Sequence, residues 1–180
     1  MLSVFDGLRS VTTLSVFVRL ACAFICGGII GIERSYKRRP AGFRTHILIC
    51  IGAAITTLTS QYLYLNMHYF TDMARLGAQV VAGIGFIGAG TIIVTKRQNV
   101  KGLTTAAGLW TSAIIGLAFG GGFYEGGILA TGFIMLAEQV FSRLEYRVLE
   151  HVPEIISFLT NVLTQYLESL ELLRLSPSIK

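Results

Sequence analysis

The feature that most constrains this fold is a series of long apolar segments separated by short charged clusters. A transmembrane helix needs about twenty consecutive apolar residues to cross a hydrocarbon layer about 30 Å thick. Apolar segments of this kind lie at residues 14–32, 46–65, 76–95, 103–123 and 126–141. A soluble core would instead alternate apolar and polar positions. The pattern therefore predicts an all-α membrane protein, with a compact bundle of about five transmembrane helices in residues 1–145.

The composition agrees with this prediction. The chain is 53% hydrophobic and only 14% charged, and its mean hydropathy is +0.65, far more apolar than an average soluble domain. The fifth segment is the weakest of the series because it is the shortest and carries Glu138. Helix tilt or local bilayer thinning absorbs a modest mismatch, and counts of four or six spans stay open.

The distribution of positive charge predicts the orientation in the membrane. Lysine and arginine in short loops are retained on the cytoplasmic side. The second connection holds only Arg75, and the fourth holds no cation. The first and third connections and the region after the last segment hold Arg34, Lys37, Arg38, Arg39, Arg44, Lys96, Arg97, Lys101, Arg143 and Arg147. We therefore expect an outside N-terminus, a cytoplasmic C-terminus and an odd number of crossings.

Small residues recur at helical spacing within three of the segments. In lipid, where apolar burial gives helices no drive to associate, such positions let two backbones approach closely. The predicted helix-packing residues are Gly27, Gly31, Ala78, Ala82, Gly85, Ala89, Gly116 and Gly120. We expect these faces to meet in a compact bundle with little room for a wide water-filled pore. They also suit contact with a helix of a membrane partner or of a second copy in a homodimer.

Residues 146–180 predict a short helical tail on the cytoplasmic side. After Pro153, apolar residues repeat at helical intervals at Ile155, Leu159, Val162, Tyr166, Leu170 and Leu173. The polar face of this amphipathic helix is acidic and neutral, so it favours docking on the bundle or pairing with another copy over adhesion to anionic lipid.

Several other functional classes are disfavoured. The net charge of +5 does not indicate nucleic acid, because the cations sit in short loops without interleaved stacking aromatics. Gly83, Gly85 and Gly88 match the spacing of a dinucleotide-binding loop, but no acidic residue for the ribose occurs between Asp72 and Glu125. Helix packing explains these glycines better. No Gly-x-Ser-x-Gly elbow is present, and we expect no enzyme activity, no catalytic residue and no cofactor.

Ionisable groups inside a membrane span are costly, so each is a functional candidate. Arg19 lies in the outer half of the first span. We expect it either to pair with Glu125 or Asp72, which the topology places on the same side, or to extend its charge outward to water.

The strongest polar cluster is predicted at the cytoplasmic mouth of the bundle. It combines residues of the first connection with residues around the start of the fourth segment, namely Glu33, Arg34, Arg44, Thr45, Asn99, Lys101, Thr104 and Thr105. A carboxylate, hydroxyls and an amide could hold a hydrated cation there. A solvated, positively charged loop is the alternative interpretation.

Four sequence blocks carry a family resemblance: GIER at 31–34, AGFRT at 41–45, AQVVAGIGFIGAG at 78–90 and VKGLTTAAGLW at 100–110. In order and spacing they resemble the signature blocks of the MgtC/SapB family of bacterial membrane proteins, over roughly residues 14–141. The resemblance implies a multi-pass inner-membrane protein linked to low-magnesium adaptation and, in pathogens, to survival inside host cells. For some relatives the proposed role is restraint of the F-type ATP synthase through membrane contacts, and for others it is transport.

Two functional hypotheses follow. The first is a non-enzymatic factor of magnesium homeostasis or envelope stress that acts through helix contacts with a membrane partner or with itself. The second is a small divalent-cation transporter or channel in which Glu33, Thr104 and Thr105 hold Mg²⁺ at the cytoplasmic mouth. In that case Gln79 and Asn99 are further polar ligands.

Overall fold

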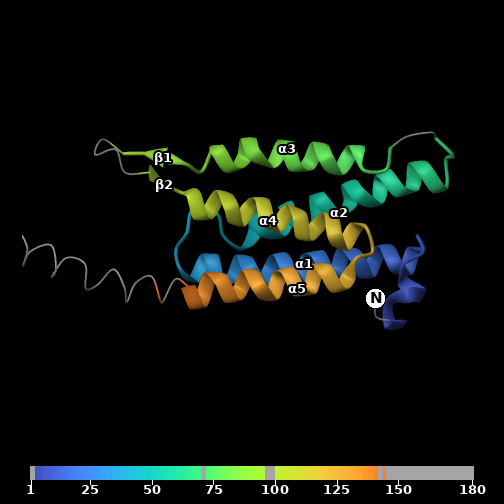
Figure 1. The fold of residues 1–180 in the computed structure, drawn as a ribbon, viewed down its shortest axis with the longest axis horizontal. Helices are drawn as coiled ribbons and strands as arrows, with labels where there is room; N and C mark the ends of the chain where they lie inside the picture. The colour runs from blue at the N-terminus through green and yellow to red at the C-terminus, as the bar shows by residue number, and fades with distance from the viewer. Residues whose placement is uncertain (1–2, 70–71, 96–99, 142–143, 145–180) are drawn as a thin grey trace, which may run out of the picture. The chain divides into compact units, whose positions relative to one another are not determined.

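The computed structural model describes residues 3–69, 72–95, 100–141 and 144. The order of elements is a 3₁₀ helix η1 (Ser3–Leu8), α1 (Thr13–Tyr36), α2 (Phe43–Leu65), α3 (Arg75–Ala89), the strands β1 (Ile93–Val94) and β2 (Val100–Lys101), α4 (Leu103–Gly120), α5 (Tyr124–Leu136) and a π-helical turn at Ala137–Phe141 (Figure 1). The predicted all-α class is confirmed. Asn99 and the predicted tail helix in 146–180 lie outside the described residues.

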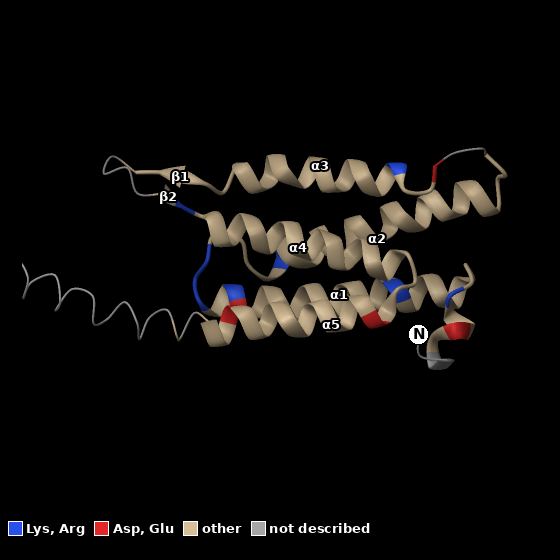
Figure 2. Cartoon of the chain, in the orientation of Figure 1, with Lys and Arg blue, Asp and Glu red and all other residues tan. Residues whose placement is uncertain are grey.

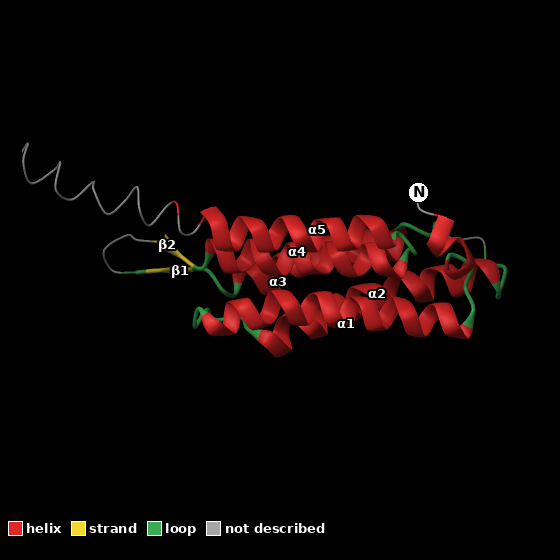
Figure 3. Cartoon of the chain, turned by 90° about the horizontal axis from the view of Figure 1, so that it is seen from below, coloured by secondary structure: helices red, strands yellow, loops and turns green. Residues whose placement is uncertain are grey.

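The chain divides into two units, Met1–Met135 and Leu136–Lys180, and helices α1 to α4 all belong to the first. The helices of this unit run back and forth, so that loops gather at their two ends (Figure 3). Helices α1, α2 and α4 are long and apolar enough to cross a membrane, whereas α3 has only 15 residues. The third predicted span, 76–95, therefore extends past the end of α3 at Ala89. After Gly90 the chain leaves the helix and forms the antiparallel pair β1–β2.

The limits of α1 and α2 follow from local chemistry. Thr12 and Ser15 form a reciprocal capping box at the start of α1, which satisfies two backbone donors that the first turn leaves open. Just after α1, Arg38 adopts a left-handed conformation with φ 52°. The chain then returns within a few residues, and Ser35 Oγ accepts a hydrogen bond from Phe43 N at 2.8 Å. This tight connection sets α1 and α2 side by side.

Glycines hold α1, α2 and α4 at close range. A Cβ atom at Gly27 would lie 2.9 Å from Cys50 Cβ on α2, and one at Gly31 would lie 2.7 Å from Phe43 Cα. A Cβ at Gly116 of α4 would lie 2.9 Å from Ala53 Cβ and would also collide with the Cys50 carbonyl. Gly120 meets α2 in the same way. The predicted packing role of these four glycines is confirmed.

The corresponding prediction for α3 is wrong within the chain. Ala78, Ala82, Gly85 and Ala89 are all exposed. The helix is rotated so that Gly88, on another side, packs against Ala106 of α4. Since α3 contacts its neighbours through one side only, the periodic row of small residues has no covering helix in the described part of the chain.

The exterior of the helices is apolar, as expected for surfaces that face lipid. Large side chains that are roughly half or more exposed include Leu14, Phe17, Phe24, Leu48, Phe86, Leu129 and Phe133. Soluble monomers rarely expose contiguous apolar surface on this scale. The interior instead contains an apolar cluster that includes Ala23, Ile30, Ile115 and Phe119, together with buried polar groups.

The glycine contacts predict a selective loss of stability. We expect Gly116→Ala to lower the free energy of unfolding by about 1–3 kcal/mol, because the new methyl group would force α2 and α4 apart. Gly52→Ala on α2 is the matched control, since a Cβ there meets nothing within 4 Å. It should leave stability unchanged or raise it slightly. Unfolding of the purified variants in detergent measures the difference, and equal effects would contradict the packing assignment.

Candidate functional site

Two arginines on α1 are buried at opposite ends of the same helix. Arg19 is 0% exposed and Arg34 is 1% exposed. They are fifteen positions apart in the sequence, which corresponds to about 22 Å along a helix at 1.5 Å per residue. A charge that is buried away from water is costly unless it is paired and hydrogen-bonded, so the partners of each guanidinium define a candidate site.

Arg34 connects α1 to the start of α4. Its Nη2 donates a hydrogen bond to Thr105 Oγ1 at 3.4 Å, and both residues are buried. His46, in the first turn of α2, is also fully buried, with Nδ1 2.9 Å from the carbonyl oxygen of Gly42. The predicted convergence of the first connection with the start of α4 is thus confirmed for Arg34 and Thr105.

Glu33 is the carboxylate of this end. Its side chain is 8% exposed, and Oε1 forms a 2.6 Å ion pair with Lys37 Nζ one helical turn along. The order Glu then Lys at i, i+4 is the favourable one on a helix. A divalent cation at this carboxylate would have to compete with the ammonium group that already lies there.

The remaining predicted site residues do not join this buried cluster. Thr104 is exposed while Thr105 is buried, because successive residues of a helix point about 100° apart. Arg44, Gln79 and Lys101 are exposed, and Thr45 is half-buried. Within the described residues, no group of three or more His, Cys, Asp or Glu side chains is arranged to hold a metal ion.

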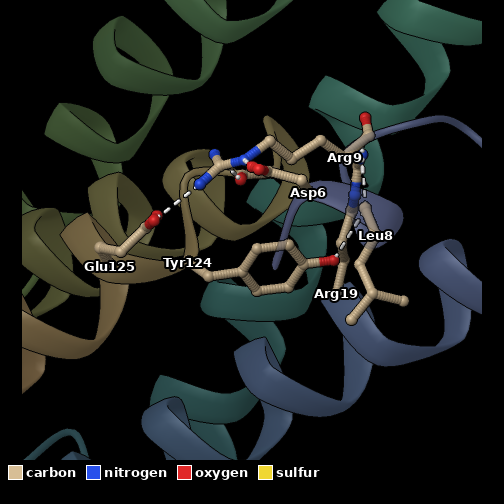
Figure 4. Close-up of polar contacts among 7 residues, drawn as sticks. Asp6, Leu8, Arg9, Arg19, Tyr124 and Glu125 are labelled. Carbon is tan, nitrogen blue, oxygen red and sulfur yellow. Dashed lines mark hydrogen bonds and ion pairs between the residues drawn. The ribbon is translucent and has the colours of Figure 1, made fainter. Parts of the chain in front are cut away.

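Within the part of the chain that the structure describes, the hydrogen-bond partners of Arg19 are neutral oxygen atoms. Its Nη1 donates to Gln61 Oε1 at 2.7 Å and to the Gly120 carbonyl at 2.8 Å. Its Nη2 donates to the carbonyls of Leu8 and Arg9 at 3.2 and 2.7 Å (Figure 4). Gly120 ends α4, and the last carbonyls of a helix are unpaired and carry partial negative charge. The guanidinium therefore neutralises the C-terminal end of α4.

Both expectations for Arg19 are wrong. It does not extend to water, since it is fully buried, and its partners are not Glu125 or Asp72. Glu125 Oε1 instead pairs with Arg9 Nη2 at 2.6 Å. The Gly120 carbonyl lies within reach of Arg19 because close packing at Gly120 holds the end of α4 against α2.

Sequence reasoning missed Arg9, Gln61 and Tyr124. Arg9 also pairs with Asp6 at 3.1 Å and donates to the Gly122 carbonyl at 3.1 Å. Burial lowers the pKa of Arg9, but its hydrogen bonds and charge interactions with Asp6 and Glu125 outweigh this effect and raise the pKa above its usual value. The partners Arg9 and Glu125 are more than a hundred positions apart in the sequence, and no local pattern marks them. Only Gln61, a polar residue inside an apolar segment, gave a usable signal.

The family model described as "MgtC family" matches residues 20–147. The chain is 43% identical over 141 residues to the Escherichia coli (strain K12) protein named "Putative magnesium transporter YhiD", covering 76% of this chain and 65% of that protein. It is 44% identical over 116 residues to "Protein MgtC" of Brucella abortus (strain 2308), covering 64% of this chain and 47% of that protein. The chain thus spans less than two thirds of the length of these relatives. No solved structure matches it.

Thr104 and Thr105 provide a matched test of the Arg34 end. Thr105→Val keeps the side-chain shape but removes an acceptor of the buried guanidinium, and we expect it to lower the free energy of unfolding by about 1 kcal/mol. Thr104→Val at the exposed neighbouring position should change it by less than about 0.5 kcal/mol. Equal losses in denaturation experiments on the two variants would mean that both hydroxyls are used, as a shared cation site requires.

Proposed function

Because this chain belongs to the MgtC family, we propose that it is a membrane protein of magnesium physiology that acts without catalysis, through helix contacts. The contact surface is the exposed small-residue face of α3, defined as Ala78, Ala82, Gly85 and Ala89. The occupant of this face is a helix of another membrane protein or of a second copy. The link to magnesium rests on the family and on the name of the Escherichia coli relative.

The rotation of α3 is the observation that carries this proposal. The packing glycines of α1 and α4 already lie against the backbone of a neighbouring helix within the chain. On α3, a Cβ added at Gly85 would meet nothing within 4 Å. Small residues give no advantage against fluid lipid, but they allow a second helix to approach closely and gain van der Waals contact. An exposed row of them therefore favours contact with a further helix.

Gln79 and Phe86 support the same face. Gln79 is exposed on α3, three positions before Ala82 and so on a neighbouring part of the helix surface. An amide facing hydrocarbon lacks the hydrogen bonds that a polar group needs there. A glutamine carries both donors and an acceptor, so a partner amide or a second copy could satisfy it. Phe86 is 86% exposed and extends beyond the small residues. By family resemblance alone, the F-type ATP synthase is one candidate partner.

The charge distribution supports a bacterial inner-membrane location with the Arg34 end in the cytoplasm. In the first unit, that end carries Arg34, Lys37, Arg38, Arg39, Arg44 and Lys101 against the carboxylate of Glu33 (Figure 2). At the Arg19 end, the described cations Arg9, Arg19 and Arg75 are balanced by Asp6, Asp72 and Glu125. Cationic connections are held on the cytoplasmic side, which favours an N-terminus on the outside.

Cysteine crosslinking in native membranes tests the contact surface. In a variant whose three native cysteines are replaced by alanine, we expect Ala82→Cys or Gly85→Cys to form a disulfide-linked dimer or a crosslink to a partner after mild oxidation. Gly132→Cys on α5 is the control, since it is also exposed and a Cβ there meets nothing within 4 Å. Absence of any α3 crosslink, or equal yield at the control position, would refute the proposal.

The orientation has a separate test in the same cysteine-free background. Labelling of Arg39→Cys by an impermeant reagent on intact cells would refute it.

Magnesium transport is the second candidate function, and one observation favours it. Glu33 Oε2 is buried and accepts no hydrogen bond from the described residues, so it is an oxygen ligand that a cation could use. In this alternative Glu33, Thr104 and Thr105 line the entry of the ion.

Flux measurements separate the two functions. If helix contact is the function, purified protein in liposomes containing a magnesium-sensitive dye should admit no more Mg²⁺ than empty liposomes under an inward gradient. Uptake by the unchanged protein that disappears in Glu33→Gln, but persists in Asp6→Asn, which changes an exposed carboxylate away from this site, would instead establish transport through the buried carboxylate.

A further inference from the structure

The N-terminal residues 5–10, called the strap, lie over the end of the helices where α4 turns into α5. Phe5 stacks on Tyr124 with ring centroids 4.9 Å apart and an interplanar angle of 16°. Tyr124 Oη donates a hydrogen bond to the Leu8 carbonyl at 3.2 Å. Phe5 and Leu8 also pack against the apolar core. The strap is thus held by both apolar and polar contacts. Figure 4 shows the polar contacts.

The strap covers the buried guanidinium of Arg19. Two of the four acceptors of Arg19 are backbone carbonyls of the strap, at Leu8 and Arg9. The other two, Gln61 Oε1 and the Gly120 carbonyl, belong to the helices. Without the strap, Nη2 would lose both of its acceptors among the described residues, and water would have to replace them. The strap therefore supplies hydrogen-bond acceptors to the buried Arg19 guanidinium in place of water.

Arg9 fastens the strap to the α4–α5 turn. Its Nη2 forms the 2.6 Å ion pair with Glu125, whose side chain is 14% exposed, and its Nη1 donates to the Gly122 carbonyl at 3.1 Å. Charge-assisted hydrogen bonds of this kind are stronger than neutral ones. The contact of Arg9 with Asp6 stays within the strap, and the Asp6 side chain is 65% exposed.

Helix α1 does not need the strap in order to begin. Its first turn is capped by the reciprocal hydrogen bonds between Thr12 and Ser15, and both residues follow the strap. Ser15 Oγ also donates to the Ser10 carbonyl, which fixes the point where the strap joins the helix. The strap can consequently leave its seat by rotation near Ser10 and Val11 while α1 stays folded.

We propose that the strap is a releasable lid over Arg19 and that the Arg9–Glu125 ion pair is its latch. In the closed state the lid excludes water from the guanidinium and from Gln61. In the open state these two groups face water at the Arg19 end of the helices. This inference is independent of the proposed contact face on α3.

Amide hydrogen exchange of the full chain in lipid nanodiscs tests the lid. We expect Glu125→Gln to raise the exchange rate of peptides that cover residues 5–10 about tenfold, the effect of weakening one charge-assisted hydrogen bond. Peptides from the middle of α1, around residues 20–32, should keep their rate. Asp6→Asn is the matched control, because it removes a carboxylate partner of Arg9 without touching the α4–α5 turn, and it should have little effect.

Arg9→Gln provides a second route to the open state. It should reproduce the exchange pattern of Glu125→Gln, and combining the two changes should add little, because both remove the same ion pair. Unchanged exchange of the strap in both variants would overturn the proposal. A parallel rise in α1 would also overturn it, since the segment would then unfold with the helix instead of opening as a lid.

Discussion

The burial of two guanidinium groups on a single membrane helix is the constraint on which the rest of this structure depends. Arg19 and Arg34 are both almost inaccessible, and a charge in hydrocarbon persists only where protein oxygens replace water. The two ends of α1 meet this requirement differently. Arg34 donates a hydrogen bond to the hydroxyl of Thr105 on α4. Arg19 takes an amide oxygen and three backbone carbonyls, two of them from the N-terminal strap. The strap and α4 are thereby tied to α1.

Close packing at glycines allows backbone carbonyl groups to reach the Arg19 guanidinium. Gly120 sits against the backbone of α2, and a side chain there would collide with the Ala54 carbonyl. The same residue presents its own carbonyl to Arg19 at 2.8 Å. Gly122, two positions later, has φ +77°, and an added Cβ there would lie 3.0 Å from Arg19 Nη2. Helix packing and the burial of the charge therefore depend on the same residues. A bulkier residue at Gly120 or Gly122 would disturb the surroundings of the Arg19 guanidinium.

Helix α3 stands apart from this arrangement. It joins the other helices through one side, where Gly88 packs on Ala106, and its row of small residues is exposed. The two sets of small residues have different roles. The glycines of α1 and α4 allow close packing in the interior, while the small residues of α3 form a surface that a further helix can approach. The chain belongs to the MgtC family, and we propose that it acts in magnesium physiology through contacts at this surface.

The sequence by itself determined the helical class, the approximate helix ends apart from the end of α3, and the glycines of closest approach at Gly27, Gly31, Gly116 and Gly120. These features depend on local hydrophobicity and residue size, which can be read along one segment at a time. It also predicted that Arg34 and Thr105 lie at the same end of a compact bundle, because both belong to or adjoin connections that carry positive charge. Only the tertiary structure decided the rotation of α3, the exposure of Thr104 beside buried Thr105, and the neutral oxygens around Arg19. Those outcomes depend on which side of each helix meets another, and Arg9 reaches Glu125 across 116 positions of sequence, a distance over which no local pattern carries information.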